Sequence, residues 1–130
     1  MSILNVAIDD YVEQTSVPEG EYELRITSTP VEKESKNGEP MVKFVLEIIG
    51  NPTSKLVSFF LMLPYSGQDA RAKNVAQERY IKFCKAFGYA PGAPVNIEEM
   101  VGDTAWSFLR EEESEEYGKQ NSVRGWLERK

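Results

Sequence analysis

Three stretches in the first half of the chain show the pattern of apolar and polar positions that is typical of β-strands. Residues 22–27 and 41–49 alternate apolar with mostly polar side chains, and residues 55–63 are almost wholly apolar. Alternation with a period of two marks strands with one buried face. Turn sequences separate the stretches, among them Asn37-Gly38. The pattern predicts a three-stranded antiparallel meander against which the rest of the chain packs.

The pattern then changes from strand to helix spacing. Residues 64–67 (Pro-Tyr-Ser-Gly) form a chain reversal, Asp69 is a candidate helix N-cap, and Gly88 is a candidate C-terminal stop. Between them the apolar positions recur at helical spacing: Ala72, Val75, Ala76, Tyr80, Phe83, Cys84 and Phe87. The basic residues fall largely on the other side: Arg71, Lys73, Lys82 and Lys85. This arrangement predicts an amphipathic helix with one buried face.

The last third of the chain returns to strand patterning. Residues 96–99 are typical of a single capped helical turn, closed by Gly102. Residues 104–110 and 122–127 alternate again, and we interpret the glutamate-rich residues 111–120 between them as a hairpin loop.

The order is therefore strand, strand, strand, helix, strand, strand. We predict a mainly β fold, a five-stranded OB-fold barrel with one α-helix between strands 3 and 4. Barrel closure would also protect the edges of so apolar a third strand. We assign residues 1–17 to a loosely attached N-terminal arm and residues 18–130 to the OB-fold domain.

Composition narrows the functional classes. The chain has 130 residues, of which 41% are hydrophobic, and a single cysteine, Cys84. These values favour one domain in a reducing compartment. The acidic start and the short apolar runs argue against a secretory signal and a membrane span, so we expect a cytoplasmic protein. The absence of histidine removes Ser-His-Asp and Cys-His catalysis and most zinc sites. We expect no enzyme activity, no cofactor and no metal.

The net charge of −6 argues at first against nucleic acid, but its distribution matters more than its sum. Residues 1–23 contain six acids and no base, and residues 88–118 contain eight acids and one base. The predicted helix, residues 69–87, contains five bases and two acids. Overall acidity is therefore compatible with a local basic groove.

Strand alternation predicts which side chains face outward. If Leu24 and Phe44 point inward, Arg25 and Lys43 point outward. Small residues at 105 and 107 suit a tight barrel interior, which places the next set of side chains outside. Aromatic rings interleaved with basic residues provide base stacking and phosphate neutralisation. The predicted nucleic-acid-binding residues are Arg25, Lys33, Lys36, Lys43, Phe60, Trp106, Arg110, Tyr117, Lys119, Arg124 and Trp126.

Several of these residues have an equally simple structural interpretation. Trp106 belongs to the core instead if the parity of its strand is reversed, and Trp126 is also suited to cap an open barrel end. Phe60 and its neighbour Phe59 must point to opposite faces, so one is core and the other is a stacking candidate or is covered by the helix. Lys33 and Lys36 are either solubility charges or phosphate contacts. Tyr117-Gly118-Lys119 is a candidate clamp, although the adjacent glutamates, residues 111–116, would repel phosphate. The same glutamates are suited to block the site or to recruit a basic partner.

An ordered series of short motifs over residues 18–127 carries a family resemblance. The series consists of Pro18-Glu19-Gly20-Glu21-Tyr22, Lys36-Asn37-Gly38, residues 42–49, Lys82-Phe83-Cys84-Lys85-Ala86-Phe87-Gly88, Met100-Val101-Gly102, Tyr117-Gly118 and Asn121-Ser122-Val123-Arg124-Gly125-Trp126-Leu127. In this series the chain resembles the small OB-fold single-stranded DNA-binding proteins of bacteriophages, including a family catalogued as a domain of unknown function.

The resemblance implies a protein that coats single-stranded DNA during phage DNA replication or recombination, in the cytoplasm of the bacterial host. Phage or host replication and recombination proteins are the further partners that it suggests, and a homo-oligomer is compatible with it. The chain ends in Leu127-Glu128-Arg129-Lys130 and so departs from the many single-strand binders that have an acidic C-terminal tail. We therefore do not expect a partner contact through such a tail.

Two functional hypotheses follow. The first is sequence-tolerant binding of single-stranded DNA, based on the order of elements and the interleaved rings and bases. The second is a protein-interaction module on the same fold, such as a phage factor that binds a host protein, based on the net negative charge and the glutamate-rich loop. Fold alone does not decide between them.

Overall fold

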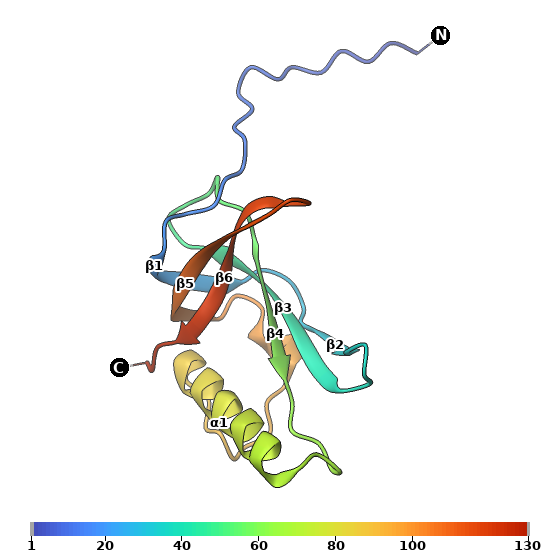
Figure 1. Cartoon of the computed structure of the whole chain (residues 1–130). Coiled ribbons are helices and arrows are strands. Elements are labelled where there is room, and N and C mark those ends of the chain that lie inside the picture. Colours follow the sequence, from blue (N-terminus) through green and yellow to red (C-terminus); the bar gives the residue numbers. More distant parts are fainter. Residues whose placement is uncertain (1, 130) are drawn as a thin grey trace.

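A strongly curved antiparallel β-sheet with one α-helix below it forms the body of the molecule (Figure 1). The computed structural model describes residues 2–129; Met1 and Lys130, the outermost residues of the predicted arm and domain, lie outside this range. The elements in chain order are β1 (Gly20–Ile26), β2 (Val31–Glu34), β3 (Pro40–Ile48), β4 (Val57–Met62), α1 (Ala70–Phe87), a 3-10 turn η1 (Ile97–Met100), β5 (Thr104–Ser114) and β6 (Gly118–Trp126). The prediction of a mainly β fold with one helix between the third strand of the meander and the last hairpin is confirmed.

β3 organises the sheet. It pairs with β4 along one edge, and with β2 and then β1 along the other, always antiparallel. β1 pairs in turn with β5, and β5 with β6, which gives the order β2-β3-β1-β5-β6 with β4 on the far edge of β3. The predicted meander of β1, β3 and β4 is confirmed.

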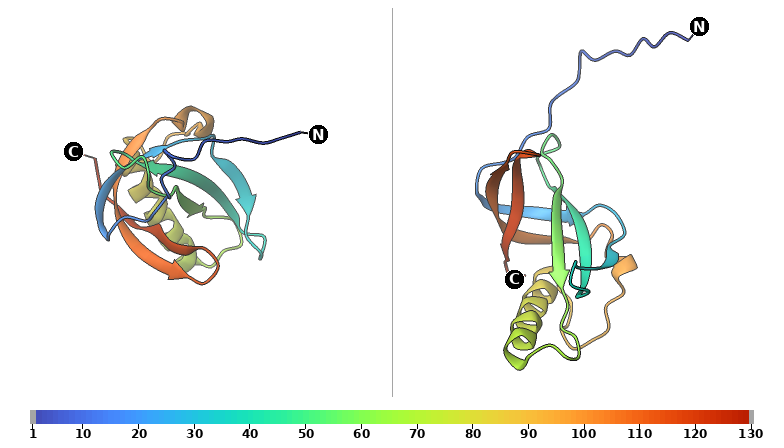
Figure 2. Two further views of the ribbon diagram at one scale, coloured as in Figure 1. Left: turned by 90° about the horizontal axis from the view of Figure 1, so that it is seen from above. Right: turned by 45° about the vertical axis from the view of Figure 1, so that its right-hand side comes forward.

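The predicted closed five-stranded barrel is wrong in two respects. Within residues 2–129 the sheet has six strands, because residues predicted as loop form β2. All four β2 residues are exposed, so no apolar alternation reveals the strand; a tight turn at Gly38 (φ 78°) folds it onto β3. In the same residues β4 and β6 contact each other without forming a ladder of backbone hydrogen bonds, so the sheet remains open along this seam (Figure 2).

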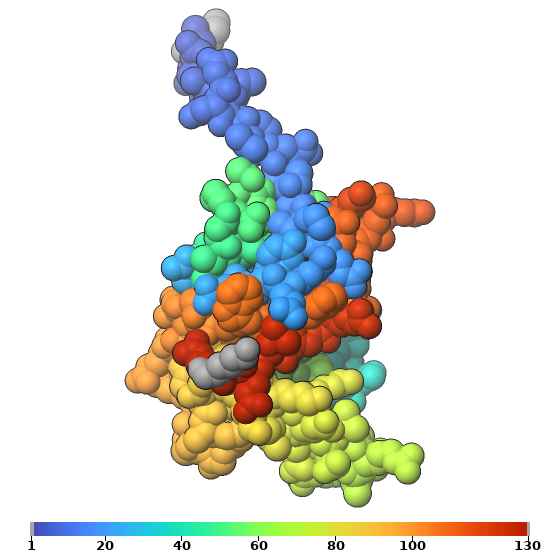
Figure 3. All heavy atoms as spheres, turned by 90° about the vertical axis from the view of Figure 1, so that its left-hand side faces the viewer, coloured from blue at the N-terminus to red at the C-terminus, as the bar shows by residue number. Residues whose placement is uncertain are grey.

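The predicted loop at residues 111–120 is also wrong over most of its length. β5 runs on to Ser114 and β6 begins at Gly118, so a two-stranded ribbon projects beyond the core, with Glu113 opposite Lys119 (Figure 3). Most side chains of this ribbon are exposed, so it has no buried face and no apolar alternation to predict it.

The concave side of the sheet and the apolar face of α1 form one core. Alternate residues of β1, β3 and β5 are buried there, as the alternation predicts, including Leu24, Phe44 and Leu109. The predicted ends of α1 are confirmed. The Asp69 carboxylate accepts a hydrogen bond from the Ala72 amide at 2.9 Å, and Gly88 adopts the left-handed conformation (φ 85°). α1 packs against β4, β5 and β6, and so brings its side chains to the open seam.

Cys84 lies on the buried face of α1 and is 1% exposed. Burial raises the pKa of its thiol, which disfavours the reactive thiolate. We therefore expect no reaction with an aromatic disulfide reagent in native protein and one reacted thiol per chain after unfolding in urea. Rapid labelling of native protein, followed by absorbance, would contradict this burial.

The chain is anchored to the body from Thr15 onward. The Thr15 amide donates to the Thr53 carbonyl at 3.1 Å, and the Lys55 amide donates to the Thr15 carbonyl at 2.9 Å. Two residues later, the Asn121 side chain bonds both the amide and the carbonyl of Val17, each at 2.8 Å. Residues 2–14 extend away from the body (Figures 1 and 3). No helix within residues 2–129 has the length and apolar character needed to cross a bilayer.

Candidate nucleic-acid interface

A groove of about 410 Å³ lies along the open seam, between β4, β6 and α1. Arg79 and Lys82 of α1 and Arg124 of β6 line it together with aromatic and apolar residues of the two strands. Among residues 2–129, the side chains that line this groove include no acid. In a chain with a net charge of −6, this is the local basic groove that the charge distribution allows.

Phe60 provides an exposed ring at the edge of this groove. It is 44% exposed, and Lys43, directly opposite on β3, places its ammonium 5.8 Å from the ring centroid. The adjacent Phe59 points to the other face, where its ring stacks on Phe83 at 5.9 Å. Of the two alternatives for this pair, Phe59 is therefore the core residue and Phe60 is the ring available to stack with a base.

Trp126 packs against the core instead of facing freely outward as predicted, although it is also among the residues that line the groove. Its backbone pairs with Ser107, and its ring contacts Phe59, Phe83 and Phe87 with centroids 5.1–5.6 Å apart. The reason is a register shift between Phe108 and Leu109: β6 has one residue more than β5 at this point. Such a bulge reverses the parity of the strand beyond it.

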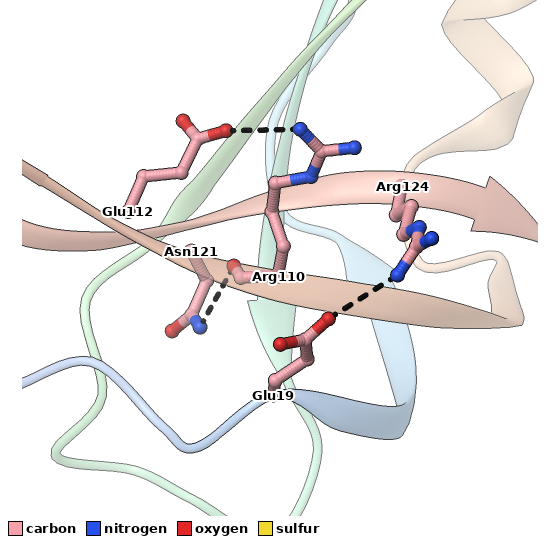
Figure 4. A network of polar contacts seen from close by, with 5 residues as sticks. All are labelled: Glu19, Arg110, Glu112, Asn121 and Arg124. Carbon is pink, nitrogen blue, oxygen red and sulfur yellow. Dashed lines mark hydrogen bonds and ion pairs between the residues drawn. The ribbon is translucent and has the colours of Figure 1, made fainter.

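That extra residue is Arg124, which is exposed although it lies only two positions before the inward Trp126. Its guanidinium lies 5.6 Å from the ring centroid of Phe108 and 3.3 Å from a carboxylate oxygen of Glu19 (Figure 4). Both partners of the ion pair are more than half exposed, so the pair is weak and a phosphate can compete for the arginine.

The predicted parity of β5 is correct, but it does not bring Trp106 to the groove. Ala105 and Ser107 are buried, and Trp106 is 49% exposed. Trp106 lies opposite Glu23 of β1, in a separate cleft of about 930 Å³. Three acids, Glu21, Glu23 and Glu128, and one base, Arg129, line this cleft. Acidic neighbours disfavour a nucleic-acid contact at this ring.

Two further predicted arginines are paired with acids outside the groove. Arg25 contacts Glu47 at 2.6 Å, and Arg110 contacts Glu112 at 3.6 Å (Figure 4 shows the latter). Each of these four side chains is about half exposed, so the pairs are exposed surface pairs. Neither arginine is among the residues that line the groove.

The remaining predicted residues lie at two other ends of the sheet (Figure 1). Lys33 lies on β2 opposite Met41, and Lys36 is in the turn that follows. Tyr117 and Lys119 are exposed at the tip of the β5–β6 ribbon, where Lys55 donates to both of their carbonyl groups. Of the predicted residues, the structure therefore brings Phe60, Arg124 and Trp126 together at one groove. Lys43 lies beside Phe60 at its edge, and the other candidates lie outside it.

The sequence interpretation missed Arg79, Lys82 and Phe108. Arg79 and Lys82 are exposed on one face of α1, and Lys82 also contacts Glu78 at 3.3 Å. Helical spacing places the two bases on the polar side of α1, but it does not say which strand lies beside them. Alternation puts Phe108 in the same outward-facing set of β5 as Trp106, and only its contact with Arg124 links it to the groove.

We compared the chain with known protein families and with curated proteins, and the first comparison gives a family. A family model described as "Protein of unknown function (DUF669)" matches residues 4–122. No curated protein matches the chain. The matched range contains β4 and α1, and thus two of the three walls of the groove, and it ends within β6 before Arg124.

Proposed function

We propose that this chain, which belongs to the DUF669 family of proteins of unknown function, binds single-stranded DNA in the groove between β4, β6 and α1. The observation that supports this most directly is the composition of the groove. Three basic side chains and an exposed aromatic ring lie at one place, with no acid among the described residues that line it. Arginine and lysine side chains neutralise phosphates, and exposed aromatic rings stack with nucleobases whatever the sequence of the DNA.

The resemblance to phage single-strand binders extends the proposal to a process. The protein would coat single strands during phage DNA replication or recombination in the host cytoplasm, alongside other replication and recombination proteins. The open sheet supports an OB-type arrangement, in which β1, β3, β4, β5 and β6 correspond to the five strands and β2 is an addition within the first connection.

The first test is a fluorescence anisotropy titration with a labelled oligo-dT. We expect binding that weakens as salt rises, because phosphate contacts release counterions. Phe60→Ala should weaken binding by about 1–3 kcal/mol, the usual contribution of one stacked base. Trp106→Ala is the matched control, since it removes a similarly exposed ring from the acidic cleft, and we expect it to leave binding unchanged. A flat titration at low salt would contradict the proposal.

The second candidate function, a protein-interaction module, is favoured by the cleft around Trp106. An exposed ring flanked by Glu21 and Glu23 is suited to a basic segment of a partner protein. A pull-down from host lysate, with and without nuclease, distinguishes the candidates. A partner that is retained after nuclease treatment and lost in Trp106→Ala supports this function; a partner lost with nuclease counts against it.

A further inference from the structure

The segment before Thr15 exposes an unusual amount of apolar surface. Six large side chains within ten residues are 60–91% exposed: Ile3, Leu4, Val6, Ile8, Tyr11 and Val12. Single exposed apolar residues are ordinary, but a contiguous series of them is typical of an interaction segment. We call residues 3–13 the arm.

The arm and the groove have complementary chemistry. The arm contains Asp9, Asp10 and Glu13 and no base. The groove presents Arg79, Lys82 and Arg124, with no acid among the described residues that line it, and its other lining residues are mainly aromatic or apolar. An extended acidic segment with apolar side chains matches this surface in charge and in polarity. The groove also lies between β4 and β6, the two strands that do not pair with each other, so an extended segment finds free strand edges there.

The direction in which the arm leaves the body favours docking in the groove of another molecule over docking in its own groove. The chain leaves the body at the end of the sheet remote from α1, and it points away from it (Figures 1 and 2). The hydrogen bonds of Thr15 and Val17 hold the chain just after the last residue of the arm, and so fix the point at which the arm leaves the body. An extended segment of this length spans roughly 35 Å, at about 3.4 Å per residue. We propose that the arm of one copy docks in the β4–β6–α1 groove of a second copy, where it competes with other ligands of the groove.

Sedimentation velocity without DNA tests this proposal. Wild-type protein should associate as its concentration rises. An arm variant (Ile3→Ser, Leu4→Ser, Val6→Ser and Ile8→Ser) and a groove variant (Arg79→Glu and Lys82→Glu) should each weaken self-association at least about tenfold, as expected for the loss of anchor residues. All of these side chains are exposed, and unchanged urea midpoints will show that both variants fold. Arg71→Glu with Lys73→Glu, on the same helix but not among the groove-lining residues, is the matched control and should associate like wild type.

Mixing the two variants makes the test specific. The arm variant keeps an intact groove, and the groove variant keeps an intact arm, so an equal mixture should form a heterodimer that neither variant forms alone. A wild-type protein that remains monomeric at all concentrations, an arm variant that still self-associates, or a mixture that does not associate would each overturn the proposal.

The outcome is separable from the proposed DNA binding, which uses the same groove. If the arm does not dock, the arm variant and wild type will bind oligo-dT equally in the anisotropy titration. If the arm docks, the arm variant will bind oligo-dT more tightly at protein concentrations at which wild type is associated. If oligo-dT does not bind at all, sedimentation still decides whether the arm docks.

Discussion

Reversing the three groove charges together, by Arg79→Glu, Lys82→Glu and Arg124→Glu, is expected to weaken single-stranded DNA binding by at least about 100-fold at low salt. Each basic side chain that neutralises a phosphate contributes about 0.7 to the slope of log affinity against log salt concentration for single-stranded DNA. The loss of three contacts should therefore flatten that slope by roughly 2. An anisotropy titration with labelled oligo-dT between about 50 and 200 mM salt measures both quantities.

The control for this prediction changes the net charge by the same amount elsewhere. Lys33, Arg71 and Lys73 do not line the groove, and replacing each of them with Glu also converts three bases to acids. We expect this control to lose far less affinity, because none of the three side chains lines the groove and salt screens a charge that makes no direct phosphate contact. Equal losses in the two triple variants would show that net charge, and not this groove, governs binding.

The groove triple variant should lose little stability. Arg124 and Lys82 each form one ion pair, with Glu19 and Glu78, and all four side chains are more than half exposed. Such pairs contribute about 0–1 kcal/mol. A urea midpoint close to that of wild type will therefore separate lost binding from lost folding.

Local patterns could predict the outward side chains only where the strand is regular. On β5 the small residues Ala105 and Ser107 correctly indicated the inward face, which placed Trp106 outside. On β6 the same reasoning assigned Arg124 and Trp126 to one face, and the bulge opposite Phe108 separates them. A bulge depends on how two strands match in length, so the sequence of one strand does not reveal it.

The groove itself is a product of long-range packing. Phe60 comes from the predicted meander, where alternation requires only that it and Phe59 point to opposite faces. Alternation does predict the outward position of Lys43, which lies opposite Phe60. Arg79 and Lys82 come from a helix whose position against the strands is fixed by the core that Phe83 and Phe87 form with the sheet. Whether β4 and β6 form a hydrogen-bonded pair depends on residues about sixty positions from each other in the sequence. A local sequence pattern contains no information about such a pairing. For this reason the sequence indicated a barrel, whereas the structure has an open seam with basic residues along it.

The aromatic residues of the seam divide into two groups with different tasks. Phe60 lies at the rim, where its loss should affect ligands and leave the fold intact. Trp126 lies below it and joins both strands to α1 through its contacts with Phe59, Phe83 and Phe87. Because β4 and β6 do not pair with each other within residues 2–129, these ring contacts hold the seam together in place of a hydrogen-bond ladder.

Trp126→Ala is therefore expected to lower the free energy of unfolding by about 3 kcal/mol, the lower end of the usual range for removing a packed tryptophan. The loss lies at the lower end because Trp126 also lines the groove, and its buried indole N–H has no hydrogen-bond partner among the described residues, so no bond is lost with it. Trp126→Phe should recover much of the loss by restoring ring contacts. Trp106→Ala, an exposed ring of the same kind, should change stability by no more than about 0.5 kcal/mol. Urea unfolding followed by circular dichroism measures all three variants. If Trp126→Ala and Trp106→Ala cost the same, side-chain packing at position 126 does not hold β4, β6 and α1 together.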